Sequence, residues 1–277
     1  SLKVRNRVSE KDMFENGSIR IKTKPFYTVK ALDVSIPKGR MIAVTGVSGS
    51  GKTSLVIECL VPALQAVIQG TKLPEHVDSI EAKGIQSVKV IDSKPIGANV
   101  RSTVATYDGV FDDLRKLFAR TADAKAKGLT AGDFSYNTGK LRCPVCDGTG
   151  IITMDVQFLP DVDTICPSCG GSRYGKDAYD ILWKSKEKDS VSVSLPGLLK
   201  LTVEEAAGIL HEETKIAKQL KILQDLGVCY LTLGEATPAL SGGEAQRLKL
   251  AYEMETPQQG SVFVFDEPTI GLHPQDV

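Results

Sequence analysis

The stretch GVSGSGKT at residues 46–53 decides the fold. It fits the pattern of a phosphate-binding loop, G-x-x-x-x-G-K-[ST]. An apolar run, MIAVT at 41–45, precedes it, and a helical pattern at 53–60 follows. We predict that 41–45 form a buried parallel strand and that Pro62 kinks or ends the helix. Strand, glycine-rich turn and helix in this order predict an α/β core.

The loop residues explain how a nucleotide is held. Glycines let backbone N–H groups surround a β-phosphate, and the helix N-terminus adds positive potential. Lys52 would reach the β and γ phosphates, and the Thr53 hydroxyl would hold Mg²⁺. An ordinary glycine-rich turn is the alternative, but it does not require the flanking strand and helix. The predicted ATP contacts are Gly46, Val47, Ser48, Gly49, Ser50, Gly51, Lys52 and Thr53.

A second motif, LSGGEAQR at 240–247, opens a helix expected at 242–254. Ser241 caps this helix and Glu244 completes a capping box, which alone is a common arrangement. The free N–H groups at such an N-terminus can also bind an anion. Twenty-five residues after Ser241, Asp266 and Glu267 end an apolar strand expected at 261–265. Asp266 can hold Mg²⁺ through water, and Glu267 can polarise the attacking water.

A phosphate-binding loop, an LSGGE helix and a strand ending in Asp-Glu, in that order, are the marks of an ATP-binding cassette (ABC) ATPase. In that family, two such domains enclose ATP, and each completes the site of the other. We therefore expect Glu267 to be the catalytic base. The residues expected to serve the opposing nucleotide, in a second ABC half or a homodimer, are Ser241, Gly242, Gly243 and Glu244.

Four of the six cysteines form two Cys-x-x-Cys pairs, Cys143 with Cys146 and Cys166 with Cys169, nineteen residues apart. This spacing is typical of a tetrahedral Cys₄ zinc site with a hairpin between the pairs. So small a module cannot bury enough apolar surface to fold unaided, whereas Zn²⁺ contributes about 10 kcal/mol. We predict structural zinc. The run CPVCDGTG also resembles a chaperone zinc repeat, which needs four copies.

Bulk composition narrows the class of protein. The 277 residues carry 34 basic and 34 acidic side chains, which argues against a uniformly basic nucleic-acid binder but leaves a local basic groove possible. No apolar run approaches the roughly 18 residues of a membrane span. Residues 1–10 are charged and unlike a signal peptide. We expect a cytoplasmic protein without membrane contact.

Several segments together resemble the C-terminal half of the UvrA family, the damage-recognising ATPases of bacterial nucleotide excision repair. The resemblance covers nearly the whole chain except about the first 25 residues and 121–132. Its most specific part is the Cys₄ module between loop and signature, which transporter ATPases lack. The matching segments are GVSGSGKTSL (46–55), PIG to FDDLRKLFA (95–119), FSYN (134–137), LRCPVCDGTG (141–150), FLPDV (158–162), CPSCGGSRY (166–174), LGEATPALSGGEAQRLKLA (233–251) and DEPTIGLH (266–273).

The resemblance implies ATP and Mg²⁺ at the loop, a zinc hairpin that helps read damaged double-stranded DNA, and a UvrB-like partner. Arg101 lies on the family's RS-x-x-ATY stretch and is expected to face a DNA phosphate, although a solvated surface arginine is an alternative. Lys116, Arg120 and Arg142 are further candidates of the same kind. Such phosphate contacts position a protein on DNA without specifying a base.

Three departures from the family pattern stand out. Ser93 occupies the place of a glutamine and would touch Mg²⁺ only through water. Ala98 stands where arginine is common. The sequence ends at Val277, before the strand and histidine that sense the γ-phosphate, so we expect a fragment or a truncated protein that hydrolyses ATP poorly alone.

The predicted architecture is an α/β ABC core interrupted by a mostly helical signature and insertion domain. Its predicted parts are the loop lobe (1–97), the insertion (98–236, with the zinc module at about 135–185) and the signature, acidic strand and return to the core (237–277). Other readings are a UvrA-like protein of drug resistance, another ABC ATPase subunit not acting on DNA, such as a transporter subunit, and a chaperone-like zinc module with a vestigial nucleotide site.

Overall fold

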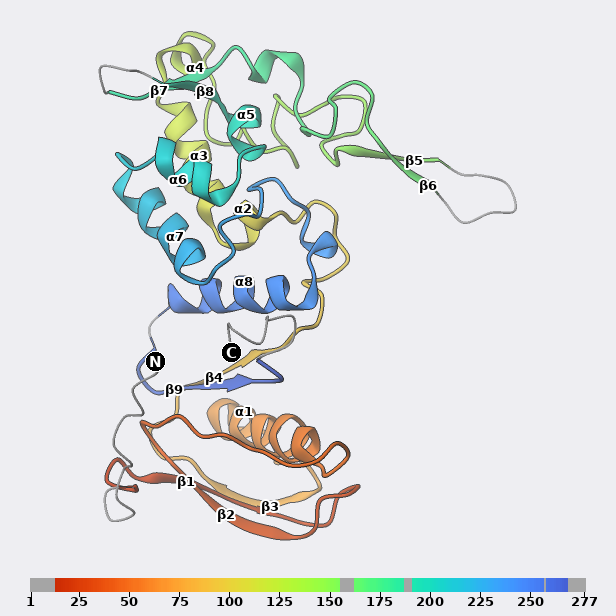
Figure 1. Cartoon of the computed structure of the whole chain (residues 1–277), viewed down its shortest axis with the longest axis vertical. Coiled ribbons are helices and arrows are strands. Elements are labelled where there is room, and N and C mark those ends of the chain that lie inside the picture. The colour runs from red at the N-terminus through yellow and green to blue at the C-terminus, as the bar shows by residue number, and fades with distance from the viewer. Residues whose placement is uncertain (1–12, 155–161, 187–190, 257, 269–277) are drawn as a thin grey trace, which may run out of the picture. The chain divides into compact units, whose positions relative to one another are not determined.

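The computed structural model describes residues 13–154, 162–186, 191–256 and 258–268 (Figure 1). These residues divide into two compact units. Unit 1 comprises those within Ser1–Ile91 and Pro257–Asp266, and unit 2 those within Asp92–Thr256 and Glu267–Val277. The helix of the LSGGE motif is part of unit 2, whereas the predicted boundaries grouped it with the return to the core.

Unit 1 combines two small sheets with one helical segment. Strands β1 (Ser18–Thr23), β2 (Leu32–Pro37) and β3 (Val77–Glu81) form an antiparallel sheet in the order β2-β1-β3. Along β1, Ile19 and Ile21 are buried while Arg20 and Lys22 are exposed, so one face of this sheet is covered. Helix α1 (Val61–Gln69) packs beside β3 and β4 (Ser87–Ile91), and its Leu64 is fully buried (Figure 1).

The strand expected at 41–45 and a helix end at Pro62 are both wrong, while a kink at Pro62 stays a prediction. Residues 41–45 form no strand, and Met41 is fully exposed, because the described residues offer no neighbouring strand for this run to pair with. The helix also does not end at Pro62. A π-helical stretch, Ser54–Leu60, leads directly into α1, with the Val61 N–H bonded to the Val56 carbonyl. Pro62 therefore sits at the second residue of α1, directly after the change from π-helix to α-helix.

The acidic strand pairs in parallel with another strand of unit 1. Strand β9 (Ser261–Phe265) runs parallel to β4, with Val264 opposite Val90 and Phe265 opposite Ile91. The alternating run SVKVI predicts a strand at 87–91, and this strand and the one expected at 261–265 are both confirmed with their bounds.

Unit 2 is built mainly from helices around one apolar core. Its core includes Phe118, Tyr136, Leu198 and Leu248. Its helices are α2 (Val104–Tyr107), α3 (Val110–Ala119), α4 (Ala122–Ala126), α5 (Leu195–Leu199), α6 (Val203–Ile209), α7 (Thr214–Asp225) and α8 (Gly242–Met254), with short 3₁₀ turns at Lys176–Ala178 and Thr237–Ala239.

Sequence patterns located these helices well. Apolar residues at helical spacing predict helices at 110–120 and 213–226, which are α3 and α7, and the helix expected at 242–254 is α8. Thr202 and Glu205 fit a capping box, and this box is present at the start of α6. A glycine after a helical run predicts the end of the helix, and Gly227, with φ +70°, follows the end of α7.

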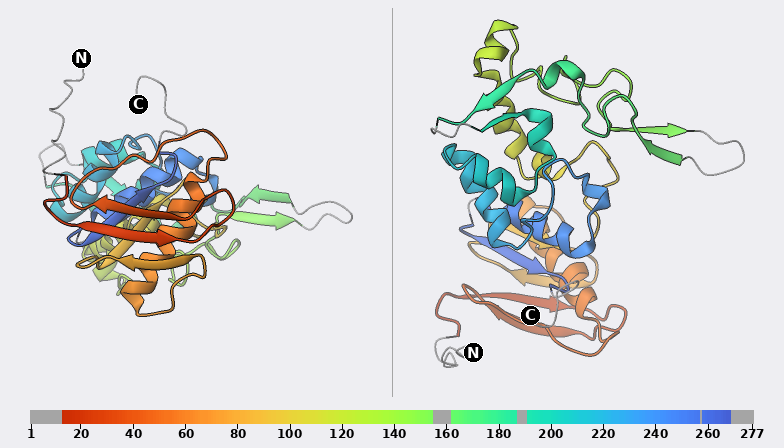
Figure 2. Two further views of the ribbon diagram at one scale, coloured as in Figure 1. Left: turned by 90° about the horizontal axis from the view of Figure 1, so that it is seen from below. Right: turned by 45° about the horizontal axis from the view of Figure 1, so that its top comes forward.

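Two antiparallel strand pairs complete unit 2. Strands β7 (Leu182–Lys184) and β8 (Ser192–Ser194) pair near α5, and β5 (Ile151–Met154) pairs with β6 (Val162–Ile165). The β5–β6 hairpin projects away from the helices of unit 2 (Figures 1 and 2). Of the described helices, none is long and apolar enough to cross a membrane.

Candidate functional site

The phosphate-binding loop of unit 1 is closed on itself. The Lys52 ammonium donates to the carbonyls of Gly46 and Val47, both at 2.9 Å, and the Ser50 N–H donates to Val47 at 3.2 Å. Gly51 has φ +89°, and a Cβ there would lie 2.9 Å from Val29 Cγ2. A side chain at this position would therefore both strain the backbone and clash. The Lys52 ammonium therefore lies against the first residues of the loop, where a phosphate would bind.

An aromatic residue beside this loop was missed by the sequence patterns. Tyr27 is 82% exposed and has φ +47°, and the next two residues, Thr28 and Val29, abut Gly51. An exposed aromatic ring next to a phosphate-binding loop can stack on a nucleotide base. A single tyrosine in a turn has no spacing signal, so only its exposure in the fold marks it.

The acidic pair lies where the parallel strands end. The Asp266 N–H donates to the Ile91 carbonyl at 3.2 Å, which extends the β4–β9 ladder by one residue. Asp266 is half-buried and Glu267 is exposed, with φ +46°. A positive φ is uncommon for glutamate and is a form of backbone strain found at functional sites. These positions suit metal and water contacts at the carboxyl edge of the strands.

The start of α8 in unit 2 is the predicted capping box. The Glu244 N–H donates to Ser241 Oγ at 3.4 Å, and the Ser241 N–H donates to the Glu244 carboxylate at 2.7 Å. The Tyr230 hydroxyl donates to the same carboxylate at 2.8 Å. A Cβ on Gly242 would lie 3.1 Å from the Ser93 carbonyl oxygen. Gly242 therefore packs directly against Ser93.

Lys249, further along α8, binds the residues on either side of Ser93. The Lys249 ammonium donates to the Asp92 carboxylate, to the Asp92 carbonyl at 3.1 Å and to the Lys94 carbonyl at 2.7 Å. Both side chains of the ion pair are largely buried, at 15% and 22% exposure. Because the partners are 157 residues apart, no local pattern marks them.

The four predicted zinc ligands come together in unit 2. Their sulfur atoms all lie within 4.8 Å of one another, with Cys143 and Cys166 at 3.9 Å and Cys146 and Cys169 at 3.7 Å. Zinc–sulfur bonds of about 2.3 Å in a tetrahedron place sulfurs about 3.8 Å apart, whereas a disulfide needs about 2.05 Å. The donor set therefore fits Zn²⁺. The Gly150 N–H also donates to Cys146 Sγ at 3.3 Å.

Tight backbone contacts support this module. Gly148 has φ +79°, and a Cβ there would lie 1.7 Å from the Tyr136 carbonyl oxygen. The Arg173 carbonyl accepts the Cys143 N–H at 2.9 Å. The Arg173 guanidinium lies 5.2 Å over the Tyr136 ring. Burial lowers the pKa of this guanidinium. Arg173 anchors the second cysteine pair to the core of unit 2 through this ring.

The structure brings two of the four predicted DNA-contact residues together. Arg101 and Arg142 both contact Asp147, the residue after Cys146. Lys116 and Arg120 instead lie on or just after α3 and are exposed, with Lys116 3.4 Å from Asp113. The arginines beside the zinc module and the basic residues of α3 are thus two separate groups.

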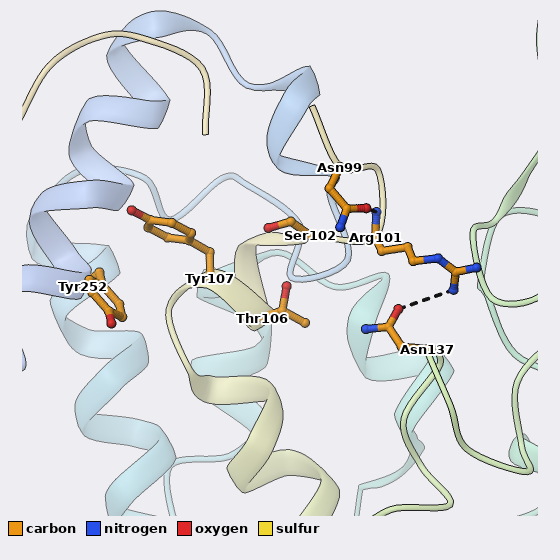
Figure 3. Close-up of a pocket in the computed structure, with 7 residues that line it drawn as sticks. All are labelled: Asn99, Arg101, Ser102, Thr106, Tyr107, Asn137 and Tyr252. Atoms are coloured by element: carbon orange, nitrogen blue, oxygen red, sulfur yellow. Dashed lines mark hydrogen bonds between the residues drawn. The ribbon is translucent and has the colours of Figure 1, made fainter. Parts of the chain in front are cut away.

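A pocket of about 450 Å³ opens beside Arg101 in unit 2 (Figure 3). The sequence patterns singled out only one member of its lining. The lining residues are Asn99, Arg101, Ser102, Thr106, Tyr107, Asn137 and Tyr252.

Curated proteins similar to this chain include two that are named UvrABC system protein A. No family model matches it. UvrABC system protein A of Staphylococcus aureus (strain COL) is 44% identical over 252 residues, which are 90% of this chain and 26% of that protein. The protein of that name from Helicobacter pylori is 41% identical over 267 residues, 95% of this chain and 28% of that protein.

A solved structure agrees with these relatives. The crystal structure of UvrA2 from Deinococcus radiodurans matches with a TM-score of 0.85 and 38% identity, over 100% of this chain and 32% of that one. The chain spans about a quarter to a third of the length of the proteins it matches. With the phosphate-binding loop, the signature helix and the gathered cysteines in an α/β ABC ATPase fold, the chain matches a segment of UvrA-family proteins.

Proposed function

We propose that this chain is the second nucleotide-binding half of an ATP-dependent protein that recognises DNA damage in nucleotide excision repair. The observation that carries the proposal is the link between the cysteine cluster and two arginines: Asp147 follows the ligand Cys146 and contacts Arg101 and Arg142. A zinc module that positions cations suits phosphate binding. The name of the S. aureus relative, UvrABC system protein A, supports the same function.

In this proposal Lys52, Thr53 and Asp266, all in unit 1, bind ATP and Mg²⁺. Lys52 neutralises phosphate charge, and the hydroxyl of Thr53 and the carboxylate of Asp266 hold the metal. Glu267 orients the attacking water as general base. Ser93 is too short to bond the metal directly, which is a reason to expect slow hydrolysis by this chain alone. Tyr27 provides a stacking surface for the adenine.

The signature residues of unit 2 are proposed to serve a nucleotide held by another ABC domain. That domain is a second half of the same protein or a second copy. The capped α8 N-terminus, Ser241 to Glu244, offers backbone N–H groups to the γ-phosphate of that nucleotide. A UvrB-like protein is the proposed downstream partner. We also propose that the insertion domain extends from residue 98 to residue 236.

Double-stranded DNA is the proposed macromolecular ligand. Arg101 and Arg142 would contact backbone phosphates next to the zinc module, and Lys116 and Arg120 would do so along α3. Contacts of this kind fix the register of the protein on a duplex. The β5–β6 hairpin, projecting from unit 2, would reach along the DNA (Figure 2).

A competition assay tests the proposal. The zinc-loaded chain, with ATP present, is offered a labelled damaged duplex against unlabelled damaged or undamaged duplex. We expect a preference for damage that is lost in Cys166→Ser and retained in Cys229→Ser, a variant that removes a cysteine outside the cluster. Equal affinity for both duplexes, or no binding at moderate salt, would leave an ABC ATPase with another target.

A further inference from the structure

We propose that the pocket beside Arg101 receives one unstacked nucleotide, with its base against Tyr107 and Tyr252 and its phosphate toward Arg101. The inference rests on the proposed DNA-binding function and names a site for it. Figure 3 shows the two tyrosines on one side of the pocket and Asn99, Arg101 and Asn137 on the other.

The tyrosine side suits a flat, neutral group. The two rings lie 5.5 Å apart at an angle of 46°, and Tyr252 is 45% exposed on α8. Tyr107 is half-buried at the end of α2 and packs against the core, which fixes its ring. Aromatic rings bind nucleobases by stacking with little preference for sequence, because every base has a π-face.

The opposite side suits an anionic oxygen. The Asn99 side-chain oxygen accepts the Arg101 backbone N–H at 2.9 Å, and the Asn137 side-chain oxygen accepts from the Arg101 guanidinium at 3.5 Å. Both amide oxygens are used by Arg101, so each asparagine has its NH₂ group for another acceptor. Two amide donors and a guanidinium together match a phosphate.

Charge fixes the direction of the ligand. Burial raises the pKa of the Tyr107 phenol, and the carboxylates of Glu253 and Asp92, the second of which is paired with Lys249, raise it further. A phosphate is disfavoured on the tyrosine side and favoured at Arg101. A base on the tyrosines and a phosphate at the arginine is the orientation that satisfies both sides.

Size separates a single nucleotide from intact duplex. A volume of about 450 Å³ lies within the range of small-molecule pockets, roughly 300–1,000 Å³. One nucleotide that has left the stack fits a site of this volume. Leaving the stack costs least at unpaired or damaged positions. The pocket would therefore favour DNA in which one base is already loosened.

Photo-crosslinking tests the assignment. The chain is mixed with a duplex that carries 5-iododeoxyuridine at an unpaired position, with the same base in a fully paired duplex, and with free 5-iododeoxyuridine monophosphate. Peptide mass spectrometry then locates the crosslinks. We expect the unpaired duplex to crosslink at Tyr252 or Tyr107 at least tenfold more than the paired duplex. Crosslinks confined to other residues would overturn the inference.

Matched variants separate stacking from folding. Tyr252→Leu should reduce the preference for the unpaired duplex about tenfold, the scale of one lost stacking contact. Tyr252→Phe, which keeps the ring, should retain the preference. Tyr179→Leu is the control, because Tyr179 is similarly exposed at 39% and lies outside the pocket. Unchanged preference in Tyr252→Leu would overturn the site.

The free nucleotide distinguishes failure of the pocket from failure of the proposed function. Crosslinking of the free monophosphate at the two tyrosines, without binding of either duplex, would keep the nucleotide pocket and overturn the DNA-binding function. Duplex binding with crosslinks elsewhere would keep that function and overturn the pocket.

Discussion

The Arg101 guanidinium donates to the Asp147 carbonyl at 2.8 Å and lies 3.4 Å from the Asp147 carboxylate. The other oxygen of that carboxylate is 3.0 Å from Arg142 Nε. Since Cys146 immediately precedes Asp147, the geometry of the cysteine cluster and the positions of both arginines depend on one another. Under the proposed function, a change at the cysteine cluster should therefore alter the affinity for DNA.

Charge variants at this junction should change the salt dependence of DNA affinity. Arg101→Ala should weaken binding and reduce the slope of log affinity against log salt by about one, the effect of one lost phosphate contact. Asp147→Asn should make the slope steeper, because the arginines lose a competing carboxylate. Binding titrations across salt concentrations measure both. Identical slopes in all three proteins would place Arg101 outside the DNA interface.

Metal retention should depend on the close backbone approach at Gly148. Gly148→Ala should release zinc to a chelator much faster than the parent chain, because the new Cβ meets the Tyr136 carbonyl at 1.7 Å. Gly170→Ala is the matched control: Gly170 also has a positive φ, +57°, but nothing lies within 4 Å of its Cβ position. If both variants release zinc at the same rate, backbone strain at the positive φ, and not the close approach to Tyr136, determines how fast the module loses zinc.

Local patterns predicted the elements whose physical cause is itself local. The capping boxes at Thr202 and Ser241, the helical spacing of α3 and the paired cysteines all act within a few residues. The run at 41–45 failed as a strand because pairing depends on a neighbour, which the described residues do not supply.

Long-range contacts explain what the sequence did not reveal about the site. Lys249 reaches Asp92 across 157 positions, and Arg101 reaches Asp147 across 46. Tyr107 and Tyr252 meet only because α2 packs against α8. None of these pairs has a spacing rule, so each became visible only in the folded chain.

Removing the Lys249 ammonium should loosen the segment 92–94. In Lys249→Met, the Asp92 carboxylate and two carbonyls lose their donor, and we expect a loss of about 1–3 kcal/mol in the free energy of unfolding. Urea unfolding measures this loss, and hydrogen exchange at 92–94 localises it. Lys218→Met, an exposed lysine on α7, should change little. Equal stability of the two variants would contradict a structural role for the Lys249 contacts.

Tyr27 should contribute to nucleotide affinity through its ring. Tyr27→Ala should weaken binding of a fluorescent ATP analogue about tenfold, whereas Tyr27→Phe should bind as the parent does. Titration with a matching inorganic triphosphate isolates the phosphate contribution, which Lys52→Ala should reduce and Tyr27→Ala should not. Loss of triphosphate binding in Tyr27→Ala would show damage to the loop rather than a lost stacking surface.

The buried carboxyl of Asp108 should make stability depend on pH. Burial, together with nearby Glu255, raises its pKa to about 7, and one carboxyl oxygen has no hydrogen-bond partner. An unfolded aspartate titrates near 4, so between about pH 4 and 7 the folded chain binds more protons than the unfolded chain. The contribution of Asp108 to stability therefore falls as pH rises through this window and stays constant above it.

Replacing this carboxyl with an amide should remove that dependence. In Asp108→Asn, urea unfolding should show little change in stability at pH 4.5 and a gain at pH 8, where the parent holds a buried charge. Asp177→Asn, a change at an exposed carboxyl, should follow the parent at both pH values. If Asp108→Asn is less stable than the parent at pH 8, the ionised carboxylate has a stabilising partner. Its pKa in the folded chain would then lie below the pKa of an unfolded aspartate, about 4.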